Sequence, residues 1–391
     1  MISVAEALDR AFALAPAMPT EKVPLRSGHG RVLAEPVTAR QDQPPFPASA
    51  MDGYAVRGSQ VRPGAKFRVI GEAAAGRRFA GTMGPGETVR IFTGAVVPDG
   101  ADRVVIQEDV LHEGDEITIG ANPDPASHVR SAGTDFATGD RVEAPRRLSA
   151  GDLSLLAAMN LPDLPLARRP VVALVATGDE LVLPGEEPGP DQIIASNNFG
   201  LAPIAEAEGA EVRVLPIARD NAASIRLAFE LAEGADLIVT SGGASVGDHD
   251  LIGPVAAELG MEQSFYKVAM RPGKPLMAGR LGSAMLLGLP GNPVSAIVCG
   301  HVFLRPILRA MQGLPATALP RTAARLSRPV AANGPREHYM RAVVHDDGTI
   351  APAERQDSSL LSVLTRSNAL MIRPPQDPPR AAGEQVQFIS I

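Results

Sequence analysis

The chain of 391 residues has no tryptophan, one cysteine and only 4% aromatic residues. A single cysteine, Cys299, rules out an intrachain disulfide and a zinc site built from cysteines, and it indicates a reducing compartment. No stretch of about 18 uninterrupted apolar residues occurs, so we expect no membrane-spanning helix. The start, MISVAEALDR, carries acidic residues and is unlike the cationic start of a signal peptide. These absences predict a cytoplasmic protein.

Nucleotide-binding signatures are also missing. There is no G-x-G-x-x-G after a strand and no P-loop motif, so ordinary dinucleotide and P-loop sites are not expected. The net charge of -7 argues against a surface that coats nucleic acid. Glycine and proline are plentiful instead, at 38 and 36 copies, which indicates many tight turns rather than low-complexity disorder.

Several kinds of pattern follow one another along the chain. Ser3 and Glu6 predict the capped start of a helix over residues 3–15, and Ser149 predicts the start of a second helix near 149–160. Between them, short β-branched runs with Pro-Gly and Asp-Gly turns predict a small, mostly antiparallel β module over about 55–130. Short strand-like runs return after residue 320 and predict a small C-terminal β module.

From residue 170 to residue 310, apolar runs alternate with helical patterns at the spacing of βα units. Runs such as VVALVA and DLIVT are apolar throughout, which is typical of a parallel sheet covered by helices on both faces. The sequence therefore predicts a three-layer α/β domain with a mostly parallel sheet.

Three polar loops with glycines directly follow strands of this predicted sheet. They span residues 176–181 (ATGDEL), 241–250 (SGGASVGDHD) and 288–295 (GLPGNPVS). Ligands of open parallel sheets bind at the carboxyl ends of the strands, so the three loops are expected to converge. Glycines let backbone N–H groups approach an anion, and carboxylates bind hard cations. For any one loop an ordinary strand-to-helix turn is the favoured interpretation, and the convergence of all three is what predicts a ligand site.

Positive charge is expected beside these loops. Asn292 and Pro293 predict the start of a helix whose first N–H groups are free to bind an anion. Arg271 and Lys274 flank a Pro-Gly turn and suit an oxyanion or phosphate, because arginine offers a planar fork and lysine a point charge. A basic surface hairpin is the alternative for that turn.

A hydrolase is a second reading of the middle loop, because residues 243–247 spell G-x-S-x-G with Ser245 as a candidate nucleophile. In a nucleophile elbow the strand leads directly into this motif and an apolar helix follows, whereas here Ser-Gly precedes it and Gly-Asp-His-Asp follows. No sequence context marks any of the candidate bases, His249, His301, His338 and His345. Asp248, His249 and Asp250 supply too few ligands for more than a partly hydrated Mg²⁺ completed by substrate oxygens.

Seven segments together resemble a known family. They are PPFPASAMDGYAV (44–56), RIFTGAVVPDGADRVVIQED (90–109), TGDEL (177–181), SNN (196–198), SGGASVGDHD (241–250), MRPGKP (270–275) and LPGNPVSA (289–296). In this order they are similar to the successive motifs of the molybdopterin molybdenumtransferases, the MoeA and gephyrin E-domain family. The α/β segments alone also resemble other pterin-binding proteins, but the MDGYA and FTGA segments are specific to this family.

The resemblance implies a multidomain α/β plus β fold. It implies an elongated helix-containing domain of residues 1–43 and 131–167 and a β-rich inserted domain of residues 44–130. An α/β molybdopterin-binding domain of residues 168–314 and a small C-terminal β-barrel-like domain of residues 315–391 would follow.

The implied function is molybdenum cofactor biosynthesis. Family members insert molybdate into adenylylated molybdopterin with Mg²⁺ and release AMP and the molybdenum cofactor. The resemblance further implies a cytoplasmic homodimer with an inter-chain active site, a molybdopterin adenylyltransferase of the MogA type as partner, and neither nucleic acid nor membrane as partner. A serine hydrolase and a non-catalytic scaffold on the same fold are the alternatives.

Site residues carry over by motif. The implied catalytic residues are Asp52, Thr93, Asp135, Glu180, Asp220 and Asp250, of which Glu180 and Asp250 would hold the metal ion. The implied substrate-binding residues are Thr177, Gly242, Gly243, Ser245, Arg271, Lys274, Pro275, Gly291, Asn292, Ser295, Arg341 and Ser359. Arg271 stands where the family often has lysine, which keeps the charge but changes the donor geometry.

Overall fold

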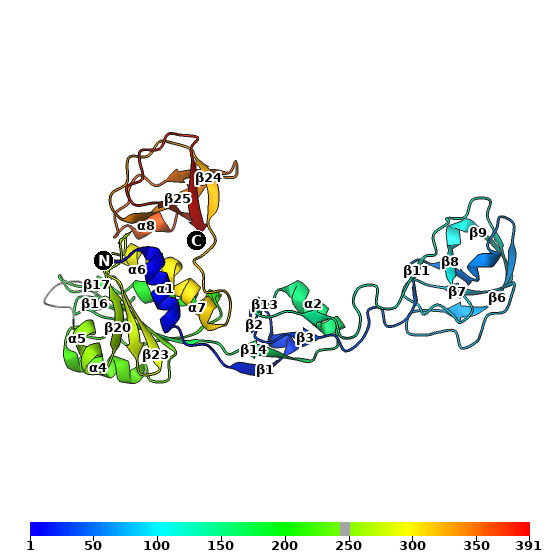
Figure 1. The fold of residues 1–391 in the computed structure, drawn as a ribbon, viewed down its shortest axis with the longest axis horizontal. Coiled ribbons are helices and arrows are strands. Elements are labelled where there is room, and N and C mark those ends of the chain that lie inside the picture. Colours follow the sequence, from blue (N-terminus) through cyan, green and yellow to red (C-terminus); the bar gives the residue numbers. More distant parts are fainter. Residues whose placement is uncertain (243–250) are drawn as a thin grey trace.

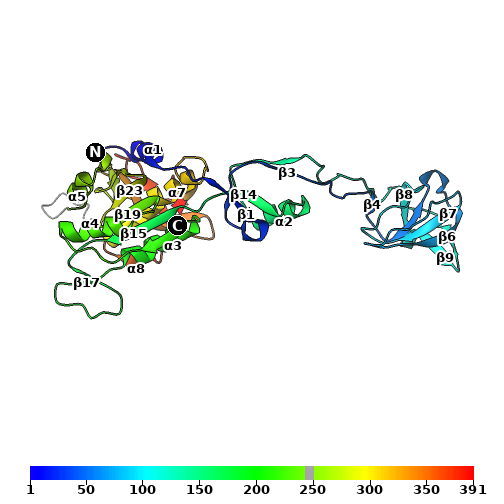
Figure 2. The same ribbon diagram turned by 90° about the horizontal axis from the view of Figure 1, so that it is seen from below.

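A computed structural model describes residues 1–242 and 251–391. The molecule is elongated: a β-rich module lies at one end, the α/β and C-terminal parts lie together at the other end, and a small helix-containing part lies between them (Figures 1 and 2). The predicted multidomain α/β plus β fold is thereby confirmed. The residue boundaries of the four domains stay a prediction.

Six short strands form the sheet of the β-rich module, in the order β8-β5-β7-β6-β10-β9. They are β5 Gly53–Val56, β6 Lys66–Ala73, β7 Glu87–Ile91, β8 Arg103–Ile106, β9 Val110–Glu113 and β10 Glu116–Ile119. Side chains of a strand alternate between the two faces of a sheet. Accordingly Tyr54 and Val56 pack in one apolar cluster, while Ala55 packs in another. The module therefore has two small cores, one on each face.

The middle part contains a four-stranded sheet in the order β1-β14-β2-β13. Its elements are β1 Thr20–Pro24, β2 Val32–Leu33, β13 Arg146–Arg147, β14 Asp163–Ala167 and helix α2 Ala150–Ala158. Ser149 caps α2 as predicted, and Asp152 completes a capping box with it. Two narrow antiparallel ribbons, β3 (Val37–Thr38) with β12 (Arg141–Val142) and β4 (Ala48–Ser49) with β11 (Val129–Arg130), lead from this part to the β-rich module.

The α/β domain is built on a six-stranded sheet in the order β18-β15-β19-β23-β22-β20. Its strands are β15 Val171–Ala176, β18 Glu211–Val214, β19 Leu237–Ser241, β20 Glu262–Tyr266, β22 Met277–Leu281 and β23 Ala284–Leu289. The first four strands in that order are parallel, and β22 runs antiparallel to both of its neighbours, β23 and β20. Its helices are α3 Asn197–Ala207, α4 Ala222–Leu231, α5 Ile252–Glu258, α6 Pro293–Cys299 and α7 Arg305–Met311, with a π-helical turn Gly300–Leu304 between α6 and α7.

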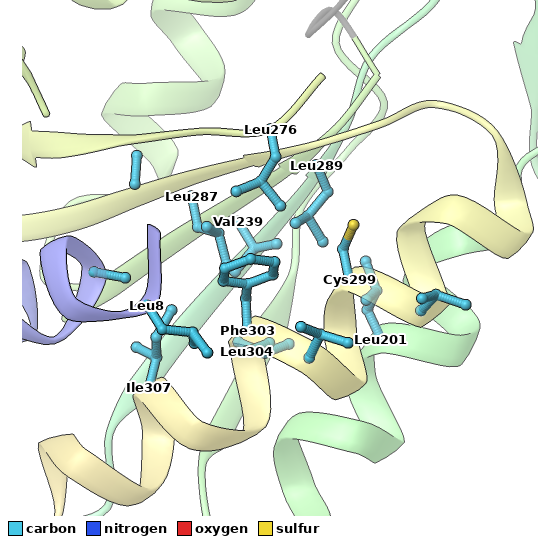
Figure 3. Close-up of a cluster of buried hydrophobic side chains, with 14 of the residues drawn as sticks. Leu8, Leu201, Val239, Leu276, Leu287, Leu289, Cys299, Phe303, Leu304 and Ile307 are labelled. Atoms are coloured by element: carbon cyan, nitrogen blue, oxygen red, sulfur yellow. The ribbon is translucent and has the colours of Figure 1, made fainter. Parts of the chain in front are cut away.

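The largest apolar core lies on one face of this sheet. Leu287 and Leu289 of β23 pack there against Phe303 and Cys299, as Figure 3 shows. Helix α1 (Val4–Leu14) adds Leu8 to the same core, although it precedes the middle part in the chain. The first helix is therefore held by the α/β domain, because its apolar stripe is buried there.

The C-terminal part is a small closed sheet. Its strands are β24 Thr322–Leu326, β25 Glu337–Val344, β26 Thr349–Pro352, β27 Ala369–Arg373 and β28 Gln385–Ser390, with a short helix α8 Leu361–Leu364. The order β25-β26-β24-β28-β27 closes through an additional pairing of β25 with β27. A further strand, β21 (Met270–Arg271), comes from the α/β segment and pairs with β25. The two domains are thus joined through backbone pairing.

One helical stretch of the described chain, Pro293–Met311, is long and apolar enough to cross a membrane by composition, with a mean hydropathy of 1.4. Most of that stretch, 78%, is buried inside the fold, where it forms the α6–α7 side of the main core. A core helix of a globular protein passes the same test of length and composition.

Candidate active site

Three of the predicted loops leave neighbouring strands at one edge of the sheet. Ala176 pairs with Ser241, and Ser241 pairs with Leu289, so β15, β19 and β23 end side by side. The Thr177 N–H donates to the Ser241 carbonyl at 3.0 Å, and the Gly242 N–H donates to the Leu289 carbonyl at 3.3 Å. These bonds lock the first residue of each loop to the end of the next strand. The predicted convergence of the loops is correct for their described residues.

Gly242 adopts a conformation that only glycine tolerates well. Its φ is +101°, and an added Cβ would lie 2.5 Å from the Thr177 carbonyl oxygen. Thr177 is buried, and its hydroxyl has no hydrogen-bond partner among the described atoms. The absence of a side chain at Gly242 therefore keeps the space above Thr177 open at the sheet edge.

Gly242→Ala is expected to destabilise the protein by about 1–2 kcal/mol, because the backbone is left-handed and the new methyl group has no space. It should also lower activity by displacing Thr177. Gly253→Ala in α5 is the matched control, because a Cβ there meets no atom within 4 Å. Thermal unfolding of both variants checks this, and equal stability of the two would contradict it.

Acidic residues lie on the loops after β15 and β18. The Asp179 N–H donates to Asp220 at 3.3 Å and the Asp220 N–H donates to Asp179 at 3.1 Å, so the two loops are bonded to each other. The Glu180 side chain is exposed and lies over Gly178, where an added Cβ would be 2.2 Å from its carboxylate. Within residues 1–242 and 251–391, no group of three or more His, Cys, Asp and Glu side chains could hold a metal ion.

Helix α6 begins as predicted, with Asn292 as its N-cap and Pro293 at its first position. The expectation of free N–H groups holds only in part, because the Val294 N–H donates to the Ser358 carbonyl of the C-terminal domain at 3.1 Å. The Asn292 side chain makes no capping hydrogen bond. Ser295, one turn into the helix, is buried. The α6 N-terminus therefore lies against the C-terminal domain rather than in open solvent.

The basic turn, residues 271–275, packs beside the same helix. A Cβ at Gly273 would lie 2.5 Å from the Cys299 sulfur at the end of α6. Arg271 and Lys274 are exposed and form no ion pair with another described residue, and Pro275 is half-buried. Exposed, unpaired cations in this turn give this edge of the domain a positive potential.

Arg341 is a buried cation of this region with unsatisfied hydrogen-bond donors. It is fully buried, its Nη2 donates to the Asp357 carbonyl at 2.9 Å, and its Nε and Nη1 have no partner among the described atoms. Burial lowers its pKa to about 10, against an opposing effect of Asp357, and Arg271 lowers it further. Buried cations without partners are costly, which is why they are typical of sites that receive an anion.

Ser359 lies in the loop that covers Arg341. Its N–H and hydroxyl donate to Asp357 at 2.9 and 2.6 Å, and these bonds lower the pKa of the Asp357 carboxyl. The Arg341 guanidinium donates to the backbone carbonyl of the same Asp357. Ser359 and Arg341 are therefore linked through hydrogen bonds to one residue. The structure thus places the predicted basic and hydroxyl ligands around the junction of α6 and the C-terminal domain.

His338, one of the candidate bases, is buried on the opposite face of β25 from Arg341, because side chains alternate along a strand. Burial lowers its pKa to about 3, and Arg271, Arg341, Arg373 and Arg336 add to this effect. A histidine with so low a pKa is a weak base at neutral pH. Burial and Arg305 similarly lower the pKa of His301 to about 4.

A pH-dependent loss of stability is expected from His338. Since its pKa falls from 6.5 in the unfolded chain to about 3 in the folded chain, stability is full above pH 6.5 and is lost as pH falls toward 3. Between neutral pH and pH 5 the loss should be on the order of 2 kcal/mol, and His338→Gln should remove it. Urea unfolding of both proteins at the two pH values measures this, and parallel pH profiles would contradict it.

Three predicted catalytic residues lie in and beside the β-rich module. The backbone N–H and hydroxyl of Thr93 both donate to Asp52 at 2.8 Å, and these bonds lower the pKa of the Asp52 carboxyl. Asp135 lines a hollow of about 580 Å³ together with Gly94 and Phe46. Figure 1 shows this module at the opposite end of the elongated molecule from the α/β domain. Within one chain, these residues do not join the predicted site residues that the structure describes in the α/β and C-terminal domains.

Three predicted residues, Gly243, Ser245 and Asp250, lie outside the described residues. Two asparagines that the sequence analysis did not select belong to the described site. Asn197 donates to the Gly291 carbonyl at 2.8 Å and links α3 to the third loop, and Asn198 is buried beside Ser241. The SNN segment before an apolar helix was the sequence signal that could have identified these two asparagines. Polar side chains at the start of a helix face the nearby loops when the helix begins at the carboxyl edge of a sheet.

Comparisons with known proteins agree with this geometry. Residues 2–160 match the family described as MoeA N-terminal region (domain I and II), residues 173–310 match the probable molybdopterin binding domain, and residues 323–391 match the MoeA C-terminal region (domain IV). A molybdopterin molybdenumtransferase of Nostoc sp. is 34% identical over 95% of this chain and 89% of its own. Molybdopterin molybdenumtransferase 2 of Mycobacterium tuberculosis is 36% identical over 93% of each chain.

A solved structure has the same architecture. The molybdopterin biosynthesis moea protein from Pyrococcus horikosii superposes with a TM-score of 0.86, at 29% identity, over 100% of this chain and 99% of its own. The likeness extends over all parts of the molecule, as the order of the sequence motifs predicted. The chain belongs to the molybdopterin molybdenumtransferase family.

Proposed function

We propose that this protein inserts molybdate into adenylylated molybdopterin and releases AMP and the molybdenum cofactor. The observation that carries the proposal is Arg341, a fully buried guanidinium with two unpartnered nitrogens, between the C-terminal domain and the domain of the molybdopterin-binding type. Molybdate is a tetrahedral dianion, and a preorganised cation that is already desolvated binds such a group strongly. Arg271, Lys274 and Ser359 would complete the oxyanion site.

The pterin substrate would bind along the carboxyl edge of the sheet. Thr177, Gly242, Gly291 and Asn292 lie there, and Ser295 is close by in α6. Backbone N–H groups near glycine and a helix N-terminus bind phosphate groups, which the substrate carries in its phosphoanhydride. The family motif assigns a substrate-binding role to Gly243 and Ser245 as well.

Mg²⁺ is proposed as the metal ion. Glu180 offers an exposed carboxylate with no ion pair to another described residue, which suits a hard cation that prefers oxygen ligands. Glu180 and Asp250 would hold the ion, with substrate oxygens completing its coordination. Bound Mg²⁺ would stabilise negative charge as the anhydride is cleaved. Asp220 would act from the loop that is bonded to the Glu180 loop.

The active site is proposed to form between two chains of a homodimer. Asp52, Thr93 and Asp135 carry predicted catalytic roles, yet they lie at the far end of their own chain from Arg341 and Glu180. A second copy in a closed dimer can bring the β-rich module of one chain to the α/β domain of the other, and two-fold pairing then gives two equal sites. We further propose a cytoplasmic location and a MogA-type adenylyltransferase as partner.

The hydrolase alternative has little support. His301 and His338 are buried with strongly lowered pKa values, so neither is a good general base. The direct test of the proposed function is incubation of the purified protein with adenylylated molybdopterin, molybdate and Mg²⁺. The expected result is AMP release together with activation of a cofactor-free molybdoenzyme. No AMP release in the complete mixture would reject the proposal, and labelling of Ser245 by a fluorophosphonate would favour the hydrolase.

A further inference from the structure

Glu208, at the end of α3, is a buried carboxylate surrounded by three arginines. Its side chain is 5% exposed and lies 2.7 Å from Arg147, 3.0 Å from Arg305 and 3.8 Å from Arg309. The Gln312 side chain donates to the Glu208 carbonyl at 2.7 Å, which fixes the backbone as well. A buried carboxylate needs compensation by cations and hydrogen bonds, and Glu208 has more of both than neutralisation requires.

The three arginines come from different parts of the molecule. Arg305 and Arg309 lie on α7 of the α/β domain, one turn apart, and already neutralise Glu208 within that domain. Arg147 lies on β13 of the middle part and also donates to the Ala207 carbonyl at 3.1 Å. Arg305 in addition donates to the Ser390 carbonyl of the C-terminal domain at 3.4 Å. The cluster therefore ties three parts of the chain together at one point.

Arg147 is paired in the sheet with Val32 of β2 and lies two strands from β14, the strand that leads into the α/β domain. Arg168, next to β14, pairs with Asp236 at 2.7 Å, and a small apolar cluster of Val32, Ala167 and Leu314 lies at the same junction. The chain crosses this joint twice, between α1 and β1 and between β14 and β15, and β1 and β14 are paired neighbours. The attachment of Arg147 lies on β13, at the opposite edge of the sheet from β1, so it opposes rotation of the middle part about these two adjacent segments.

We propose that Arg147 and Glu208 form a clasp that sets the angle of the middle part, and through it the position of the β-rich module. The middle part carries that module at its far end, so a small rotation at the clasp becomes a large displacement of Asp52 and Thr93 (Figure 1). Arg147 is thus a positioning residue for the reaction, a role that rests on the proposed function. The effect of Arg147 on the angle of the middle part does not depend on the proposed function.

Distance measurements between spin labels test the clasp. Cysteines introduced at Ser154 on α2 and Glu230 on α4 report this joint alone, and both sites are exposed. Cys299 remains in place, because it is completely buried and burial raises the pKa of its thiol. Labelled chains are diluted with unlabelled ones so that only distances within one chain contribute.

The labelled protein is expected to give a narrow distance distribution that Arg147→Ala widens. Arg309→Ala is the matched control, because it removes a cation from the same carboxylate without crossing the joint. Arg147→Lys keeps the charge and should restore most of the narrow distribution. A distribution for Arg147→Ala as narrow as that of the unsubstituted chain, or equal widening by Arg309→Ala, would overturn the proposal.

Kinetics provide the second readout. Arg147→Ala should lower kcat by on the order of tenfold, because displaced catalytic groups cost rate steeply. Its affinity for molybdopterin should be unchanged, because the α/β domain is intact. A widened distribution with an unchanged kcat would reject the positioning role. If the unsubstituted protein itself released no AMP, the proposed function would fail while the distance result would still decide the clasp.

Discussion

Arg341→Met is expected to slow molybdate insertion by about 10²–10³-fold while leaving the binding of molybdopterin intact. The guanidinium is fully buried, and two of its nitrogens have no partner among the described atoms, so its charge is only partly compensated by the described chain. Loss of one preorganised donor to a developing or bound oxyanion lowers rates by about 10²–10³. Molybdate-dependent cofactor formation and titration of the protein with molybdate measure the effect.

The thermal stability of the variant distinguishes a role of Arg341 in binding the oxyanion from a role in holding the fold together. Methionine fills much of the same space without a charge, and replacing a buried, poorly compensated cation by an apolar side chain is often neutral or stabilising. The melting temperature of Arg341→Met should therefore not fall, even though molybdate insertion is slowed. Arg325→Met, at an exposed position of β24 in the same sheet, is the control and should keep full activity. An ordinary molybdate dependence in Arg341→Met would contradict the assignment.

Asp52→Ala and Glu180→Ala are each expected to remove activity in the homodimer. The two hydrogen bonds from Thr93 orient the Asp52 carboxylate and keep it ionised, and Glu180 is the described residue of the proposed metal pair. Losing either group should lower kcat by at least about 10²-fold. Asp115→Ala, at an exposed position of the same module as Asp52, is the control. Normal AMP release by either variant would exclude that residue from the chemistry.

Much of the α/β domain was predictable because its strands are apolar along their whole length. VVALVA and DLIVT became β15 and β19, and their neighbouring positions followed from the rule that loops at the carboxyl ends converge. Ser149 marked the start of α2 because a capping box is a local signal. Patterns that depend on adjacent residues were therefore enough for these elements.

Features that depend on contacts between distant segments could not be predicted from local sequence patterns. The strand β21 has two residues, and nothing in MRPGKP indicates that Met270 and Arg271 pair with β25 of another domain. The same holds for α1, which has an ordinary amphipathic pattern but packs on a sheet that begins about 160 residues later. The burial of Arg341 and the cluster around Glu208 have no local signature, since arginine and glutamate are usually exposed.

The separation of the predicted site into two groups within one chain corresponds to the inter-chain site that the family resemblance implies. The family resemblance identified Asp52 and Thr93, and Glu180 and Asp220, but their placement depends on the two narrow ribbons that carry the β-rich module away. A single chain therefore holds two halves of a proposed site, and each half is ordered by its own hydrogen bonds.

Mixing Asp52→Ala chains with Glu180→Ala chains tests this inter-chain arrangement most directly. After dissociation and reassociation of equal amounts, half of the dimers contain one chain of each kind, and one of the two sites in such a dimer has neither substitution. The account predicts that AMP release, absent from either variant alone, recovers to about a quarter of the unsubstituted activity. Mixed dimers that form but remain inactive would contradict an active site shared between two chains.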